Sequence, residues 1–178
     1  MHLTKRHAAV IATVASTLLI LPIARGWAQD DANTYQPVTS FDPQRNPFGD
    51  LKEAVAEAGQ TQRRIMLEVG SQSCLGCKNL DQLFASDLTL KDLRDRNYIW
   101  VKINVSRENP NKQFLAQYPS VSDYPHFFVL TADGHLVHSQ DSKPMEEAKG
   151  YSPDRMKEFL NKWGPPREID SPASAVAK

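Results

Sequence analysis

The feature that most constrains this chain is the pair Cys74 and Cys77, which two residues separate. Residues 65–69 before the pair form a mostly apolar run, which is typical of a buried strand. Residues 80–84 after it carry apolar side chains at helical spacing. The sequence therefore predicts a strand that leads through a short loop into a helix, with both thiols in the first helical turn.

Two thiols three positions apart in one helical turn can close a small disulfide. The positive end of the helix dipole and its backbone N–H groups favour a thiolate at the first of them. The thiolate is the form of cysteine that attacks a disulfide. We therefore interpret Cys74 as the nucleophile and Cys77 as the thiol that resolves the mixed disulfide from inside the same turn.

The pair has three other interpretations to compare with this one. A purely structural disulfide remains open, although the loop that it closes is too short to constrain much chain entropy. Half of a site for Cu(I) or zinc remains open too, with His126 as one completing ligand. Covalent haem attachment fails because Lys78, not histidine, follows Cys77. With only 2 cysteines, the chain can form neither a disulfide-dense scaffold nor a four-cysteine zinc site.

The first 28 residues have the pattern of a secretory signal peptide. Lys5 and Arg6 precede the uncharged stretch 8–21, whose 14 residues are short for a bilayer crossing. Small residues at 26 and 28 fit cleavage after Ala28. We expect export, to the periplasm of a bacterium, and no stable membrane anchor after cleavage. An uncleaved N-terminal anchor is the open alternative.

Charge argues against nucleic acid as a partner. The 21 basic and 21 acidic residues give a net charge of zero, whereas nucleic-acid binding needs a basic surface. Cleavage would remove three of the basic residues and none of the acidic ones, so the mature chain is mildly acidic.

Hydrophobic patterning predicts one α/β domain at 48–163, after an extended segment at 29–47 and before a loose tail at 164–178. Alternating helices and strands predict parallel crossovers, and a hairpin adds antiparallel strands. The sequence thus predicts a mixed central β-sheet with helices on both faces. The expected elements are a helix from 48 that Gly59 ends, a strand at 65–69, a helix from Cys74 recapped at Ser86 or Asp87, a strand at 98–105, a short helix at 110–118, strands at 126–130 and 135–139, and a helix from Ser152-Pro153 to Trp163.

The order of elements and the position of the cysteine pair resemble the thioredoxin superfamily over residues 48–163. A later Tyr124-Pro125, leading into an apolar strand, is similar to the segment of that family that faces the cysteine pair. The resemblance implies a thioredoxin-like fold and a cis peptide bond at Pro125. It also implies that the backbone of Tyr124 binds substrate as an added extended segment.

Glu68 interrupts the apolar run six residues before Cys74. Thioredoxin-like proteins often carry a buried acid at this position, and a buried carboxyl has reason to hold a raised pKa. We expect Glu68 to relay the proton of Cys77. The alternative is a half-exposed strand on which Glu68 points to solvent.

Two departures from thioredoxin bear on redox direction. Ser73 stands where thioredoxins usually have tryptophan, and the dipeptide between the cysteines is Leu75-Gly76. Because no imidazole lies between the cysteines, we expect a less extreme thiolate than in strong oxidants, which favours a reductant or an intermediate role. The segment after Cys77 looks most like thioredoxin-like domains of periplasmic reductant carriers.

These observations predict an exported thiol–disulfide oxidoreductase that uses no cofactor or metal. Its expected partners are protein thiols or disulfides and a redox donor. The rival interpretation is a thioredoxin-like copper carrier or a non-catalytic binding adaptor. Among other residues, His126 could tune the cysteines, Tyr151 could close the edge of the site, and Trp100 is more simply a core residue.

Overall fold

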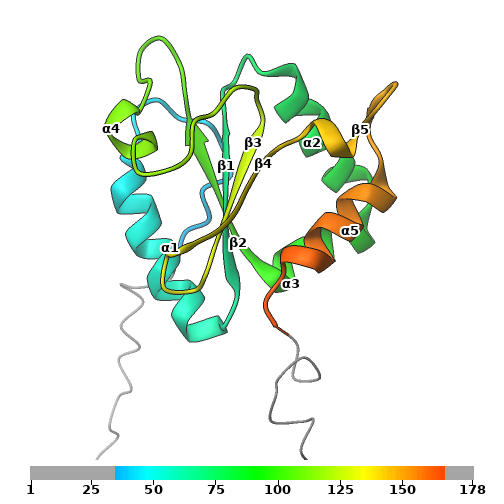
Figure 1. Ribbon diagram of the computed structural model, residues 1–178, viewed down its shortest axis with the longest axis horizontal. Helices are drawn as coiled ribbons and strands as arrows, with labels where there is room; N and C mark the ends of the chain where they lie inside the picture. Colours follow the sequence, from blue (N-terminus) through cyan, green and yellow to red (C-terminus); the bar gives the residue numbers. More distant parts are fainter. Residues whose placement is uncertain (1–34, 167–178) are drawn as a thin grey trace, which may run out of the picture. The chain divides into compact units, whose positions relative to one another are not determined.

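The computed structural model describes residues 35–166, coloured in Figure 1. The expected signal peptide at 1–28 lies outside the described residues, as do 29–34 of the extended segment and 167–178 of the tail. Within the described part, no helix is both long and apolar enough to cross a membrane.

A four-stranded sheet lies at the centre of the described part, with strand order β2-β1-β3-β4. Strands β1 (Arg64–Gly70) and β2 (Tyr98–Asn104) run parallel, as expected for two strands joined by a helical crossover. Strand β3 (His126–Leu130) pairs antiparallel with β1 on its other side, and β4 (Leu136–Asp141) pairs antiparallel with β3. The prediction of a mixed sheet is confirmed.

Helices cover both faces of this sheet (Figure 1). One face carries α2 (Leu75–Ser86), α3 (Leu88–Asn97) and α5 (Pro153–Trp163). The other face carries α1 (Pro47–Thr61) and the short α4 (Lys112–Leu115). Side chains alternate along each strand, so Met66 packs toward α2 and α5 while Ile65 and Leu67 pack toward α1.

Helix boundaries agree with the capping signals, with one exception. The Asp87 carboxylate accepts the Leu90 N–H (2.9 Å) and starts α3, and Ser152 is the N-cap of α5. The prediction that Gly59 ends α1 is wrong, because the helix continues to Thr61. Gln62 ends it instead in a left-handed conformation (φ 55°), and its side-chain amide donates to the Gly59 carbonyl (2.7 Å).

Two parts of the structure were not foreseen. Before α1, Val38 forms a parallel bridge with Val101 of β2, and Phe41 is buried, so this part of the expected lead-in packs on the domain. After β4 come a 3₁₀ turn at Lys143–Met145 and a small hairpin, β5 (Glu146–Glu147) and β6 (Gly150–Tyr151). This hairpin places Tyr151 in the core beside α2.

Candidate active site

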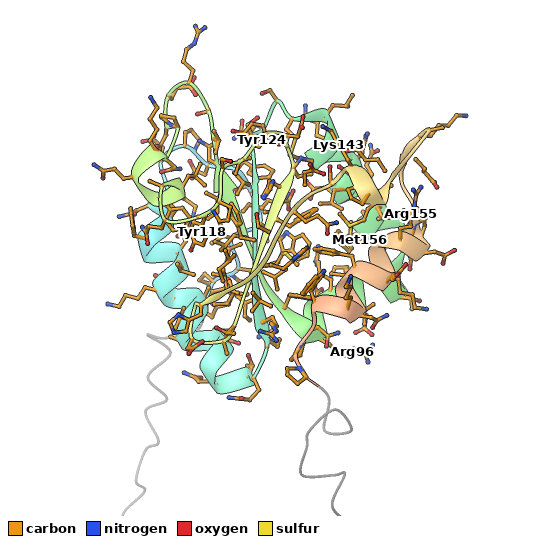
Figure 2. All side chains as sticks on the ribbon, in the orientation of Figure 1. Arg96, Tyr118, Tyr124, Lys143, Arg155 and Met156 are labelled. Atoms are coloured by element: carbon orange, nitrogen blue, oxygen red, sulfur yellow. A yellow bond between two sulfur atoms is a disulfide. The ribbon has the colours of Figure 1, made fainter. Side chains whose placement is uncertain are left out.

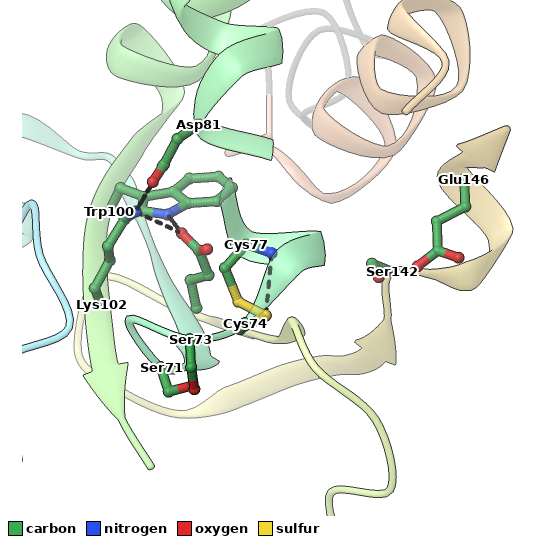
Figure 3. The surroundings of a disulfide bond; sticks show 10 residues. Ser71, Ser73, Cys74, Cys77, Asp81, Trp100, Lys102, Ser142 and Glu146 are labelled. Atoms are coloured by element: carbon green, nitrogen blue, oxygen red, sulfur yellow. Dashed lines mark hydrogen bonds and ion pairs between the residues drawn. A yellow bond between two sulfur atoms is a disulfide. The ribbon is translucent and has the colours of Figure 1, made fainter. Parts of the chain in front are cut away.

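Cys74 and Cys77 form a disulfide at the beginning of α2, with the two sulfur atoms 2.14 Å apart (Figure 3). Cys74 is the half-buried N-cap residue, whereas Cys77 lies inside the first turn with 1% of its surface exposed. Cys74 is therefore the more accessible of the two cysteines. This difference in access is what the assigned order of nucleophile and resolving thiol requires.

The local backbone favours negative charge on Cys74. The Cys77 N–H donates a hydrogen bond to the Cys74 sulfur (3.0 Å), in the position where a capping side chain accepts at a helix start. The first turn of α2 contains no acidic residue that would oppose a thiolate. Once the disulfide is opened, the same N–H can support a Cys74 thiolate.

The end of β1 provides room for the second sulfur. A Cβ at Gly70 would lie 2.5 Å from the Cys77 sulfur and 2.9 Å from the Phe41 ring, which is closer than real Cβ atoms come. The buried sulfur therefore packs directly against the backbone at the end of the strand. Only glycine at position 70 allows this approach.

The cysteine turn packs against Tyr124 and Pro125, whose peptide bond is cis as the resemblance implied. A Cβ at Gly76 would lie 2.9 Å from the Pro125 Cδ and 3.3 Å from the Tyr124 carbonyl oxygen. The side chain of Tyr124 is 44% exposed and that of Leu75 is 71% exposed, so the turn is flanked by two accessible apolar groups. Figure 2 shows Tyr124 at the end of the sheet where β1 leads into α2.

Glu68 is buried, with 1% of its surface exposed, so the alternative of a solvent-facing side chain is wrong. Burial raises the pKa of its carboxyl to about 7, against the opposing effects of the Lys102 charge and a hydrogen bond from Trp100. The Trp100 indole N–H donates to Oε2 at 2.7 Å. Oε1 has no hydrogen-bond partner among the described residues.

The residues that surround Glu68 were not predicted from the sequence. Lys102 lies beside it on β2, with its ammonium 3.9 Å from Glu68 Oε2 and 2.5 Å from Asp81 Oδ1 of α2 (Figure 3). Trp100, expected as a core residue, is only partly buried in the core and is also a hydrogen-bond donor. One sequence signal could have identified Lys102. It is a charged residue inside the otherwise mostly apolar strand β2, just as Glu68 is a charged residue inside β1.

Within residues 35–166, the histidines do not join the cysteines. His126 lies on the α1 face of β3, where its ring contacts Phe128 and its Nε2 is 2.9 Å from the Ser139 hydroxyl. Burial lowers the pKa of His126, which favours its neutral form. His138 stacks on Trp163 at 3.8 Å. Residues 35–166 contain no group of three His, Cys, Asp or Glu side chains placed to hold a metal ion.

Comparison with known proteins gives one family. A family model described as thioredoxin-like matches residues 46–132, which include both cysteines, Glu68 and Pro125. No curated protein matches the chain.

The chain is similar in structure to several solved proteins. A disulphide isomerase from Xylella fastidiosa Temecula1 aligns with a TM-score of 0.60 at 22% identity, over 68% of this chain and 94% of the isomerase. The C-terminal domain of DsbD from Neisseria meningitidis in its oxidised form aligns with a TM-score of 0.52 at 14% identity, over 66% of this chain and 96% of that domain. The reduced form of the same domain aligns with a TM-score of 0.50 at 18% identity, over 65% of this chain and 96% of that domain. At these identities the likeness concerns the fold.

Proposed function

Because the chain contains a domain of the thioredoxin-like family, we propose that it is a thiol–disulfide oxidoreductase in which Cys74 and Cys77 exchange with disulfides of partner proteins. One observation carries the proposal: the cysteine pair begins a helix, with a half-buried first cysteine and a fully buried second one, beside the Tyr124-Pro125 segment.

The exchange takes two steps. The Cys74 thiolate attacks one sulfur of the partner disulfide, forms a mixed disulfide and releases the other partner sulfur as a thiolate. The Cys77 thiol then loses its proton and attacks the Cys74 sulfur, which releases the second partner sulfur and closes the 74–77 disulfide. Two electrons pass to the partner, and a donor must return two electrons before the next cycle.

Glu68 is suited to accept the proton that Cys77 loses. Its pKa of about 7 lies near ambient pH, so the carboxyl can both take up and release a proton there. Its Oε1 is unpartnered among the described residues, while Trp100 holds Oε2. The buried position of both Glu68 and Cys77 keeps this transfer away from bulk water.

The partner is a protein disulfide in an extended segment. Tyr124 contributes its backbone beside the cysteine turn, where an extended chain could pair with it. The exposed side chains of Leu75 and Tyr124 offer apolar contacts without fixing a sequence. The name of one structural relative, a disulphide isomerase, agrees with this class of substrate.

We assign the chain to the reducing side of disulfide exchange and to the bacterial periplasm. No imidazole lies between the cysteines to stabilise the thiolate strongly, and a weakly stabilised thiolate makes the dithiol a better reductant. Export rests on the signal-peptide pattern of residues 1–28.

Single cysteine variants test the mechanism in a disulfide-reduction assay. Cys74→Ser should abolish turnover, since no thiolate remains to begin the attack. Cys77→Ser should begin the attack but accumulate mixed disulfides with the partner. Unchanged turnover in Cys74→Ser would contradict the mechanism.

A further inference from the structure

Phe41 is a buried aromatic residue in the segment before α1, with 4% of its surface exposed. Two hydrogen bonds fix this segment, one on either side of Phe41. The Lys102 N–H donates to the Val38 carbonyl (3.2 Å), and the Asn109 side-chain amide donates to the Pro43 carbonyl (2.8 Å). The backbone that carries the ring is therefore anchored to β2 and to the loop that follows it.

The Phe41 ring lies beside the buried sulfur of the redox pair. The position of a Cβ at Gly70 is 2.5 Å from the Cys77 sulfur and 2.9 and 3.1 Å from two carbons of the Phe41 ring. A single point at the end of β1 is thus in contact with both groups. Because Cys77 has only 1% of its surface exposed, the ring forms part of the apolar surroundings of this sulfur.

The same ring covers the Lys102 side chain. The Lys102 ammonium lies 4.7 Å from the centre of the Phe41 ring, within the range of a cation–π interaction. This ammonium is also 2.5 Å from Asp81 and 3.9 Å from Glu68. Phe41 therefore packs both on the resolving cysteine and on the charge next to Glu68.

We propose that Phe41 is a positioning residue for the resolving step, whose ring shields the Cys77 sulfur from water so that this thiol keeps its proton until Glu68 takes it. This inference rests on the proposed function and adds a residue to it. In that step the Cys77 thiol gives its proton to the Glu68 carboxylate, and its sulfur bonds to the Cys74 sulfur. The bond from Cys74 to the partner sulfur breaks, and the partner sulfur leaves as a thiolate with that electron pair.

Shielding keeps the roles of the two cysteines apart. A thiol in apolar surroundings is harder to ionise than a thiol that water reaches. In the reduced protein Cys77 therefore stays neutral while the half-buried Cys74 attacks the partner. A phenylalanine that served stability alone would leave the ionisation of Cys77 unaffected, so the two roles of Phe41 differ in a measurable way.

The charged groups around Glu68 come from three elements and remain in place when Phe41 is changed. They are Lys102 on β2, Asp81 on α2 and Arg94 on α3. A change in the titration of Cys77 in a Phe41 variant would therefore report on the ring and on the water that replaces it.

Phe41→Ala in a Cys74→Ser background tests the proposal. This chain has Cys77 as its single cysteine, so NMR of an isotope-labelled cysteine Cβ across a pH titration follows one thiol. Compared with Cys74→Ser alone, Phe41→Ala should increase the ratio of thiolate to thiol at a given pH about tenfold, because water reaches the sulfur. Phe41→Leu keeps an apolar side chain at this position and should leave the ratio close to that of the parent.

Phe114→Ala in the same background is the matched control. Phe114 is another buried phenylalanine, with 1% of its surface exposed, and its ring contacts those of Phe48 and Tyr118. Its loss should destabilise the fold without changing the ionisation of Cys77. If Phe41→Ala does not fold, Phe41→Val removes less of the side chain and should increase the ratio several-fold.

An unchanged ratio in the folded truncation of Phe41 would overturn the inference. An equal increase in Phe114→Ala or in Phe41→Leu would overturn it too, since the effect would then not come from the shielding of Cys77. The titration requires no partner and no turnover. Failure of the proposed function, seen in the disulfide-reduction assay, and failure of this inference are therefore separate results.

Discussion

Glu68 and Lys102 are direct neighbours across the parallel β1–β2 pair, yet the Lys102 ammonium lies 3.9 Å from Glu68 and only 2.5 Å from Asp81. Lys102 is itself 7% exposed, whereas Asp81 is 54% exposed. The Lys102 ammonium thus interacts more closely with the exposed Asp81 carboxylate than with the buried Glu68 carboxyl. This arrangement helps Glu68 to keep a pKa near 7.

Asp81→Asn should lower the pKa of Glu68. The Asp81 charge raises that pKa, and its loss also frees Lys102 to move toward Glu68. Carboxyl carbon NMR of Glu68 across a pH titration measures the shift. Asp92→Asn, which removes an exposed carboxylate paired with Arg96 on α3, is the control and should change nothing. A raised pKa in Asp81→Asn would contradict the assigned role of Asp81.

Trp100→Phe should move the same pKa in the other direction. The indole N–H donates to Glu68 Oε2 and lowers the pKa of the carboxyl, so its removal favours the protonated form. The same NMR titration reads the result. A pKa that stays at its wild-type value would mean that this hydrogen bond does not form in solution.

The raised pKa of Glu68 also makes the free energy of unfolding depend on pH. Its folded pKa of about 7 lies above the unfolded value, so between pH 4.5 and 7 the folded state binds more protons and stability falls as pH rises. Above pH 7 the loss levels off, at about 3 kcal/mol or less by the linkage between pKa and free energy.

Glu68→Gln should remove this dependence while keeping an acceptor for Trp100. Urea unfolding of the oxidised protein at pH 4.5, 6 and 8 compares the two chains. The free energy of unfolding of the variant, relative to that of the wild type, should increase as pH rises. Parallel curves for the two proteins would show that Glu68 ionises normally in the fold.

Gly70→Ala should destabilise the oxidised protein by about 1–3 kcal/mol, since the new methyl group would overlap the Cys77 sulfur and the Phe41 ring. Gly59→Ala is the matched control. It lies inside α1 with no atom within 4 Å of the added Cβ, and should stabilise by about 0.5–1 kcal/mol. Denaturant melts of both variants give the comparison, and a tolerated alanine at position 70 would contradict the packing described here.

The sequence was sufficient for the parts of the fold that carry strong local signals. The apolar face of α5 and the strand before Cys74 follow from the pattern of apolar residues, and the break between α2 and α3 was placed at Ser86 or Asp87, of which Asp87 is the cap. The β5–β6 hairpin could not be predicted, because strands of two residues leave no periodicity and Glu146-Glu147 offers no apolar side chain.

The candidate site could be predicted only in part from the sequence, for a related reason. Burial of Glu68 follows from a charge in an apolar run, but its neighbours depend on the register that sets Glu68 opposite Lys102. Likewise, the position of His126 beside Pro125 in sequence suggested a role at the cysteines. The alternation of β3 turns its side chain to the opposite face, among Phe128 and Ser139.

The reduction potential of the Cys74–Cys77 pair tests the central claim most directly. Equilibration with glutathione or dithiothreitol buffers, read by mass spectrometry of trapped thiols, gives the value. A reductant of protein disulfides should fall between about −280 and −230 mV, near thioredoxin. A value near about −120 mV would make the protein an oxidant, and one below about −300 mV would indicate a structural disulfide; either would contradict the account.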